Sequence, residues 1–111
     1  MDSHQLQQIA ALFKMLGEPS RLSLLKSLME HEELTVNQIV AESGLSQANT
    51  SKHLKALAQA DLVTSRKEGN FVLYRIQNPL VFQLCELCCQ NLEQRDAALL
   101  QELKQRLEAL P

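Results

Sequence analysis

A tight break between two short amphipathic segments constrains the fold of this chain more than any other feature. The break is SGLS at residues 43–46, in which Gly44 suits a positive φ angle and Ser46 is a good helix N-cap. Thr35 can cap the helix before the break, and a second helix is predicted over residues 47–59. Two short helices joined by such a turn predict a helix-turn-helix.

Two further helices are predicted ahead of this pair, and a long one at the end of the chain. Apolar residues repeat at helical spacing over residues 6–16, and Pro19 suits the first turn of the next helix. Pro79 opens the final helical region. Asp96 either begins a new helix there or lies within one extended helix, and the pattern leaves both readings open.

A β-hairpin is predicted between the helix-turn-helix and the final helix. Residues 63–67 and 71–76 have the composition of strands, and Glu68, Gly69 and Asn70 between them suit a tight turn. The predicted fold class is mainly α with a β-hairpin wing (α+β). The expected order is four helices, two strands and an extended C-terminal helix.

Size and composition favour one globular domain over residues 1–111. With 111 residues and 45% hydrophobic content, the chain can form one modest core. The first ten residues lack the apolar segment of a signal peptide, and no stretch is long enough to span a membrane. We therefore expect a cytoplasmic protein with reduced thiols and no membrane partner.

The charge is unevenly distributed along the chain. The formal net charge is −2, but residues 46–76 carry five basic and two acidic residues, which leaves −5 for the rest. Because proteins bind nucleic acids through local patches, the basic segment is compatible with DNA binding despite the acidic total.

The helix at residues 47–59 has two chemically different faces. Thr50, Leu54 and Leu57 share one side, which we expect to pack inward. The opposite side carries amides, small groups and cations that can read base edges in a major groove or hold phosphates. The candidate groove residues are Gln47, Ala48, Asn49, Ser51, Lys52 and Lys55. A solvated face without a ligand is the alternative.

Cations also approach the tip of the predicted hairpin. Arg66 and Lys67 precede the turn and Asn70 follows it. Such a hairpin beside a recognition helix can enter the minor groove or bind the DNA backbone. An ordinary surface hairpin is the alternative, but two short helices followed by a basic wing are more specific than either element alone.

Three stretches of the chain combine the features described so far: LGEPSRLSLLKSL, ELTVNQIVAESGLSQANTSKHLKALAQADLV and RKEGNFVLYRI. Together they resemble the ArsR/SmtB family of bacterial metal- and stress-sensing repressors, and the resemblance covers roughly residues 5–92. It implies a winged-helix homodimer that binds palindromic operator DNA and releases it when an inducer binds. It also implies that the first and last helices form the dimer, which assigns residues 79–111 to dimerisation.

The resemblance assigns DNA contacts within the recognition helix. The family's contact positions correspond to Gln47, Ala48, Ser51 and Lys52. His53 corresponds to a recurrent histidine, which we expect beside the core or a phosphate rather than on a metal ion.

The chain departs from the family at its usual sensing positions. Residues 33–37 read ELTVN where thiol-sensing members have Glu-Leu-Cys-Val-Cys, so both thiols are missing. Lys26 stands where redox-sensing members have a cysteine. The positions of the family's zinc site on the last helix hold Asn78, Leu80, Asn91 and Gln94. None of these residues supplies an anionic or imidazole ligand.

The remaining candidate sensor is a cluster of three thiols, Cys85, Cys88 and Cys89. Their helical spacing allows a soft ion such as As(III), Cd(II) or Pb(II) to bind. Zn(II) would need a fourth ligand, for which His4 is a candidate. Oxidation of Cys85 or Cys89 is a second reading, and plain packing of small apolar side chains, with Cys88 buried, is a third.

Two other function classes are compatible with parts of the sequence. A winged-helix dimer could bind a protein instead of DNA, although the basic segment argues against it. A thiol oxidoreductase would use Cys85 and Cys88, but a mid-helix position is not that of a thioredoxin-like motif, so no enzyme is expected. The acidic neighbours of His31 could bind a cation weakly, but a solvated helix end is the expected reading.

Overall fold

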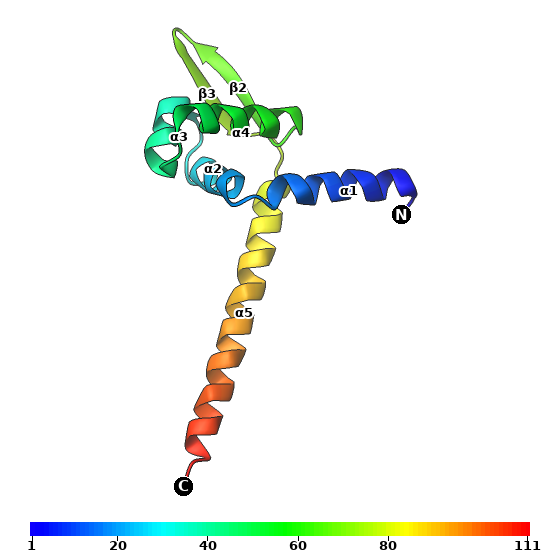
Figure 1. Ribbon diagram of the computed structural model, residues 1–111, viewed down its shortest axis with the longest axis vertical. Coiled ribbons are helices and arrows are strands. Elements are labelled where there is room, and N and C mark those ends of the chain that lie inside the picture. The colour runs from blue at the N-terminus through cyan, green and yellow to red at the C-terminus, as the bar shows by residue number, and fades with distance from the viewer. The chain divides into compact units, whose positions relative to one another are not determined.

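The computed structural model describes all residues, Met1–Pro111, as two units, Met1–Pro79 and Leu80–Pro111. The elements of the first unit are α1 (Ser3–Leu16), α2 (Pro19–Glu30), β1 (Leu34–Thr35), α3 (Val36–Ser43), α4 (Gln47–Gln59), β2 (Val63–Glu68) and β3 (Phe71–Ile76), and all of them except β1 are labelled in Figure 1. The second unit consists of α5 (Leu80–Glu108). The predicted class, mainly α with a β-hairpin wing, is confirmed.

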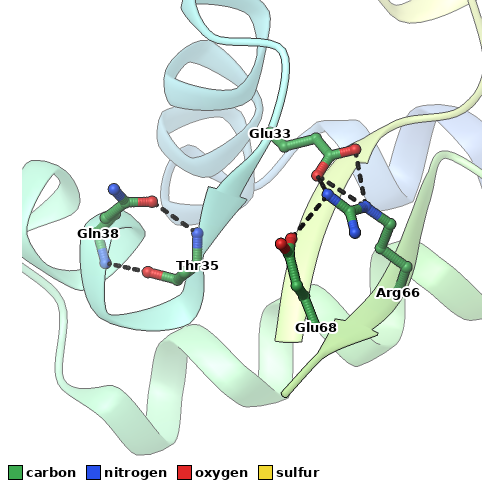
Figure 2. Close-up of polar contacts among 5 residues, drawn as sticks. All are labelled: Glu33, Thr35, Gln38, Arg66 and Glu68. Atoms are coloured by element: carbon green, nitrogen blue, oxygen red, sulfur yellow. Dashed lines mark hydrogen bonds and ion pairs between the residues drawn. The ribbon is translucent and has the colours of Figure 1, made fainter. Parts of the chain in front are cut away.

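The caps predicted for the helix-turn-helix are present. Thr35 and Gln38 form a reciprocal capping box at the start of α3, with hydrogen bonds of 2.8 and 3.2 Å (Figure 2). Gly44 ends α3 with a φ of 73°, and the Ser46 hydroxyl accepts a hydrogen bond from the Asn49 N–H at 3.1 Å. Local side-chain chemistry therefore fixes both ends of the turn.

The core of the first unit lies where α2, α3 and α4 pack on one another and on the sheet. It is mostly leucine, and the strands contribute Leu34, Val63 and Tyr74. The remaining buried apolar residues of this unit are Leu24, Leu25, Leu28, Ile39, Leu54, Leu57 and Leu62. By contrast, α1 contains no buried residue, and its Leu6 and Phe13 are more than half exposed.

The hairpin belongs to a three-stranded antiparallel sheet of order β1-β3-β2. Leu34 pairs with Tyr74, so β1 joins the segment before α3 to the wing. This strand was not predicted, because two residues carry no periodicity. Glu68 pairs with Phe71, which leaves Gly69 and Asn70 as the loop, and Gly69 has the positive φ of 60° that favours glycine.

The second unit is one uninterrupted helix. Asp96 lies within α5 and begins no new helix, which decides between the two readings of the sequence. The surrounding QRDAALLQEL contains no glycine or proline and is rich in strong helix formers. None of the helices in the chain combines the length and apolar content that crossing a bilayer requires.

Candidate nucleic-acid interface

Helix α4 separates a dry face from a solvated one, as its sequence predicts. Thr50, Leu54 and Leu57 are fully buried. The exposed side chains among the predicted groove residues are those of Gln47, at the first residue of the helix, and of Ala48, Asn49, Lys52 and Lys55. Neither lysine takes part in an ion pair. The exposed face therefore offers two amides, a methyl group and two uncompensated cations to a ligand.

Two of the predicted contact residues are half-buried. They are Ser51 and His53. His53 Nε2 lies 3.9 Å from a carboxylate oxygen of Glu18, the N-cap of α2. Backbone N–H groups of Arg21 and Ser20 lower the pKa of Glu18, against the opposing effect of burial. The imidazole of His53 therefore lies beside an ionised carboxylate at the start of α2.

The two adjacent cations of the wing have different surroundings. Arg66 forms ion pairs with Glu33 at 2.8 Å and with Glu68 at 3.0 Å, whereas Lys67 forms none. The sequence treats both as cations available to DNA. In the structure, only Lys67 is free of carboxylates, because the carboxylates reached by Arg66 offset its charge.

A hollow of about 190 Å³ lies between the start of α3, the start of α4 and the hairpin tip. Its lining includes Gln47 of α4 and Asn70 of the loop, two residues that the sequence analysis placed in the DNA-binding set. The fold thus brings the recognition helix and the wing tip to a shared surface. Its other lining residues are Thr35, Val36, Asn37, Phe71 and Val72.

The three thiols lie near the beginning of α5 and differ in their exposure within the single chain. Cys88 and Cys89 are exposed and Cys85 is half-buried. The packing reading places Cys88 in a buried position, but its apolar neighbours on the same helix, such as Leu87 and Leu92, are themselves exposed. Partial burial raises the pKa of Cys85, and the neighbouring thiolates of Cys88 and Cys89 raise it further.

Another group of potential ligands surrounds His31. Its Nε2 lies 2.8 Å from a carboxylate oxygen of Glu42, and Glu30 also reaches this group. The potential ligand atoms lie within 4.8 Å of one another, and all three residues are exposed. The hydrogen bond between His31 and Glu42 accounts for the arrangement, in agreement with the solvated helix end expected from the sequence.

Comparison with known proteins decides the family. A family model described as "bacterial regulatory protein, arsR family" matches residues 18–65, from the start of α2 into β2. The HTH-type transcriptional regulator MJ1325 of Methanocaldococcus jannaschii is 36% identical over 81 residues, 73% of this chain and 91% of that protein. The chain belongs to the ArsR family. It is a winged-helix transcriptional regulator and not an enzyme.

Two further proteins with similarity to this chain are a metal-resistance regulator and a homodimeric DNA-binding domain. The cadmium resistance transcriptional regulatory protein CadC of Listeria innocua is 35% identical over 71% of this chain and 66% of CadC. The homodimeric winged helix-turn-helix DNA-binding domain of Mb0332 from Mycobacterium bovis has a TM-score of 0.75 and 30% identity. The match covers 84% of this chain and 85% of that domain.

The carboxylates that lie beside Arg66 and His53 were not predicted from the sequence. Glu68 carried a detectable signal, because residues two apart in a strand lie on the same face of the sheet. Glu33 carried none, since it lies 33 residues from Arg66 and before a strand that was not predicted. Glu18 likewise reaches His53 only through tertiary packing.

Proposed function

We propose that this ArsR-family protein is a cytoplasmic homodimeric repressor that inserts α4 into the major groove of palindromic operator DNA. The observation that carries the proposal is the division of α4 into a fully buried face and an exposed face with uncompensated lysines. A helix supported in this way can present side chains to base edges without losing its packing.

The proposed contacts divide into base readers and phosphate binders. The amides of Gln47 and Asn49 suit adenine edges, and the Ala48 methyl group suits a thymine methyl. Lys52 reaches guanine or phosphate. The residues proposed for phosphates are Ser51, Lys55, Lys67 and Asn70, with His53 close to the backbone. Arg66, which the sequence predicts as a DNA contact, is left out of the proposed phosphate contacts because it is paired with Glu33 and Glu68.

Dimerisation is proposed to use α1 and residues 79–111. In the first unit, α1 exposes Leu6, Ile9 and Phe13. The second unit exposes a long apolar series on α5: Phe82, Leu87, Leu92, Leu99, Leu100, Leu103 and Leu107. Apolar surface of this extent is typical of interfaces rather than of solvated helices. The similar Mb0332 domain is homodimeric, which supports dimerisation of this chain.

Operator binding can be tested with a target sequence that the protein itself selects. Duplexes that bind the protein are enriched from a randomised DNA library, and the selected operator is titrated by fluorescence anisotropy at several salt concentrations. We expect tight binding whose affinity falls steeply with salt, by a log–log slope of about −0.9 for each phosphate neutralised. Failure to enrich any sequence, with binding to a protein partner instead, would favour an interaction module.

We also propose that the thiols of α5 form the inducer site, and that the inducer is a soft metal or metalloid. With α5 continuous, Cys85, Cys88 and Cys89 occupy positions i, i+3 and i+4 of one helix. Changes of rotamer in exposed side chains can bring such thiols together on a three-coordinate ion. As(III), Cd(II) and Pb(II) suit this set, whereas Zn(II) requires a fourth ligand. The similarity to CadC supports a soft-metal inducer.

If the thiols form the inducer site, soft ions should cause the protein to release its operator, and this release should depend on pH. Arsenite or Cd(II) is expected to lower operator affinity at least tenfold in the parent, on the usual scale of allosteric coupling. Because binding requires thiolates and the pKa of Cys85 is raised, a given metal concentration should release less DNA as the pH falls from 8 to 6.

The variants that test this site are Cys85→Ser and a Cys88→Ser/Cys89→Ser double variant, measured by the same anisotropy titration. Loss of metal response with unchanged operator affinity supports the site. If the parent ignores every ion but responds to a thiol oxidant, the cluster is a redox sensor. If it responds to neither, the cysteines only pack the helix.

A further inference from the structure

The guanidinium of Arg66 lies between two carboxylates on the outside of the wing (Figure 2). Its Nε donates to both carboxylate oxygens of Glu33, at 3.1 and 3.0 Å, and Nη2 lies 2.8 Å from Glu33 and 3.0 Å from Glu68. Such a multiply bonded arginine–carboxylate pair has a defined geometry, unlike a single exposed contact.

The strand register places Arg66 and Lys67 on opposite faces of the sheet. Arg66 pairs with Leu73, and Lys67 pairs with Val72. Val72 belongs to the same face as buried Tyr74, on which the helices of the core pack. Lys67 therefore shares the face directed toward the recognition helix, whereas Arg66 lies on the outer face.

Glu33 connects this ion pair to the helix-turn-helix. It immediately precedes β1, and Thr35 at the end of β1 is also the N-cap of α3. The hydrogen bond from Arg66 lowers the pKa of Glu33, and Glu33 raises the pKa of Arg66 in return. Both groups are therefore ionised at neutral pH, and the pair joins β2 to the start of α3 across β3.

We propose that Arg66 is a positioning residue, which through Glu33 fixes the wing relative to the helix-turn-helix and makes no phosphate contact of its own. The proposal rests on the DNA-binding function argued above. In this proposal Lys67, which forms no ion pair, is the cation of the wing that binds a DNA phosphate. The ion pair between Arg66 and Glu33 fixes the position of the wing relative to α4, so that both can contact the DNA at the same time.

The decisive variant is Glu33→Gln, because a charge effect would raise operator affinity whereas the loss of positioning would lower it. Removing a negative charge near DNA, and freeing Arg66 to reach a phosphate, should tighten operator binding if charge alone matters. If Arg66 positions the wing, the loss of its partner should weaken operator binding by about fivefold, with one exposed ion pair lost in each of two protomers. Glu32→Gln is the matched control, since Glu32 is exposed and forms no ion pair.

The salt dependence of binding separates the two wing cations. We expect Lys67→Ala to reduce the slope of log affinity against log salt by about 0.9 per protomer, and Arg66→Ala to leave the slope unchanged while lowering affinity. The charge-reversed double variant Arg66→Glu/Glu33→Arg should recover most of the affinity that Arg66→Glu alone loses. Circular dichroism on each variant confirms that the fold is retained.

Each outcome bears on a different claim. Tighter binding by Glu33→Gln than by Glu32→Gln, or a slope reduced by Arg66→Ala as much as by Lys67→Ala, overturns the positioning role and makes Arg66 a phosphate contact. The operator-binding function survives both results, because the parent and Glu32→Gln still bind. A parent that binds no duplex overturns the function and the positioning role together.

Discussion

Replacing Lys52 with alanine lowers the affinity for the selected operator by about a hundredfold, because each of two half-sites loses a contact to guanine or phosphate. Gln47→Ala has a similar effect, with relaxed preference at the base pair it reads. Both side chains are exposed, Gln47 at the first residue of α4 and Lys52 opposite its buried face, so the variants should unfold like the parent. Fluorescence anisotropy of the labelled operator measures the loss.

The control for Lys52 is Lys26→Ala. Lys26 is an exposed lysine of α2 that forms no ion pair and belongs to no proposed contact. It should bind the operator within about twofold of the parent, since only a distant surface charge is removed. Parent-like binding by Lys52→Ala and Gln47→Ala would show that α4 is not the recognition helix.

Replacing Leu54 with alanine destabilises the first unit by about 2–5 kcal/mol, the usual cost of a cavity at a fully buried leucine. Leu54 is completely buried on the inward face of α4. Because typical domains are stable by only about 5–15 kcal/mol, the variant should be substantially unfolded at temperatures the parent tolerates. Urea unfolding, at one fixed protein concentration to hold dimerisation constant, measures the change.

The matched variant is Leu54→Met, which nearly conserves volume and should cost less than about 1.5 kcal/mol. Operator affinity measured well below the unfolding transition should remain near that of the parent for Leu54→Met. A parent-like unfolding midpoint for Leu54→Ala would contradict the assignment of this face of α4 to the core.

The parts of the fold that follow from local chemistry were predictable from sequence. Thr35, Gly44 and Ser46 each perform the capping role that their side chains or backbone freedom allow. The hairpin turn at Gly69 and the two faces of α4 follow equally from residue type and periodicity. These features depend on neighbours a few residues away, and so the sequence carries them directly.

The features that depend on distant partners were not predictable. Arg66 and Lys67 are adjacent cations in the sequence, but the pleat sends them to opposite faces, and a carboxylate 33 residues away pairs with Arg66. The same holds for His53 and Glu18, from different helices. The burial of Cys88 depends on a distant partner of another kind, because the expected contact is with a second protomer and Cys88 is exposed in the single chain.

The most direct test of the account is a hydroxyl-radical footprint of the parent protein on its selected operator. Two recognition helices related by a two-fold axis should protect two inverted half-sites whose centres lie about 10 base pairs apart, one helical turn, with one dimer bound per duplex. Protection of a single half-site, or no protection at concentrations that saturate the dimer, would contradict the proposal that this protein reads DNA with paired α4 helices.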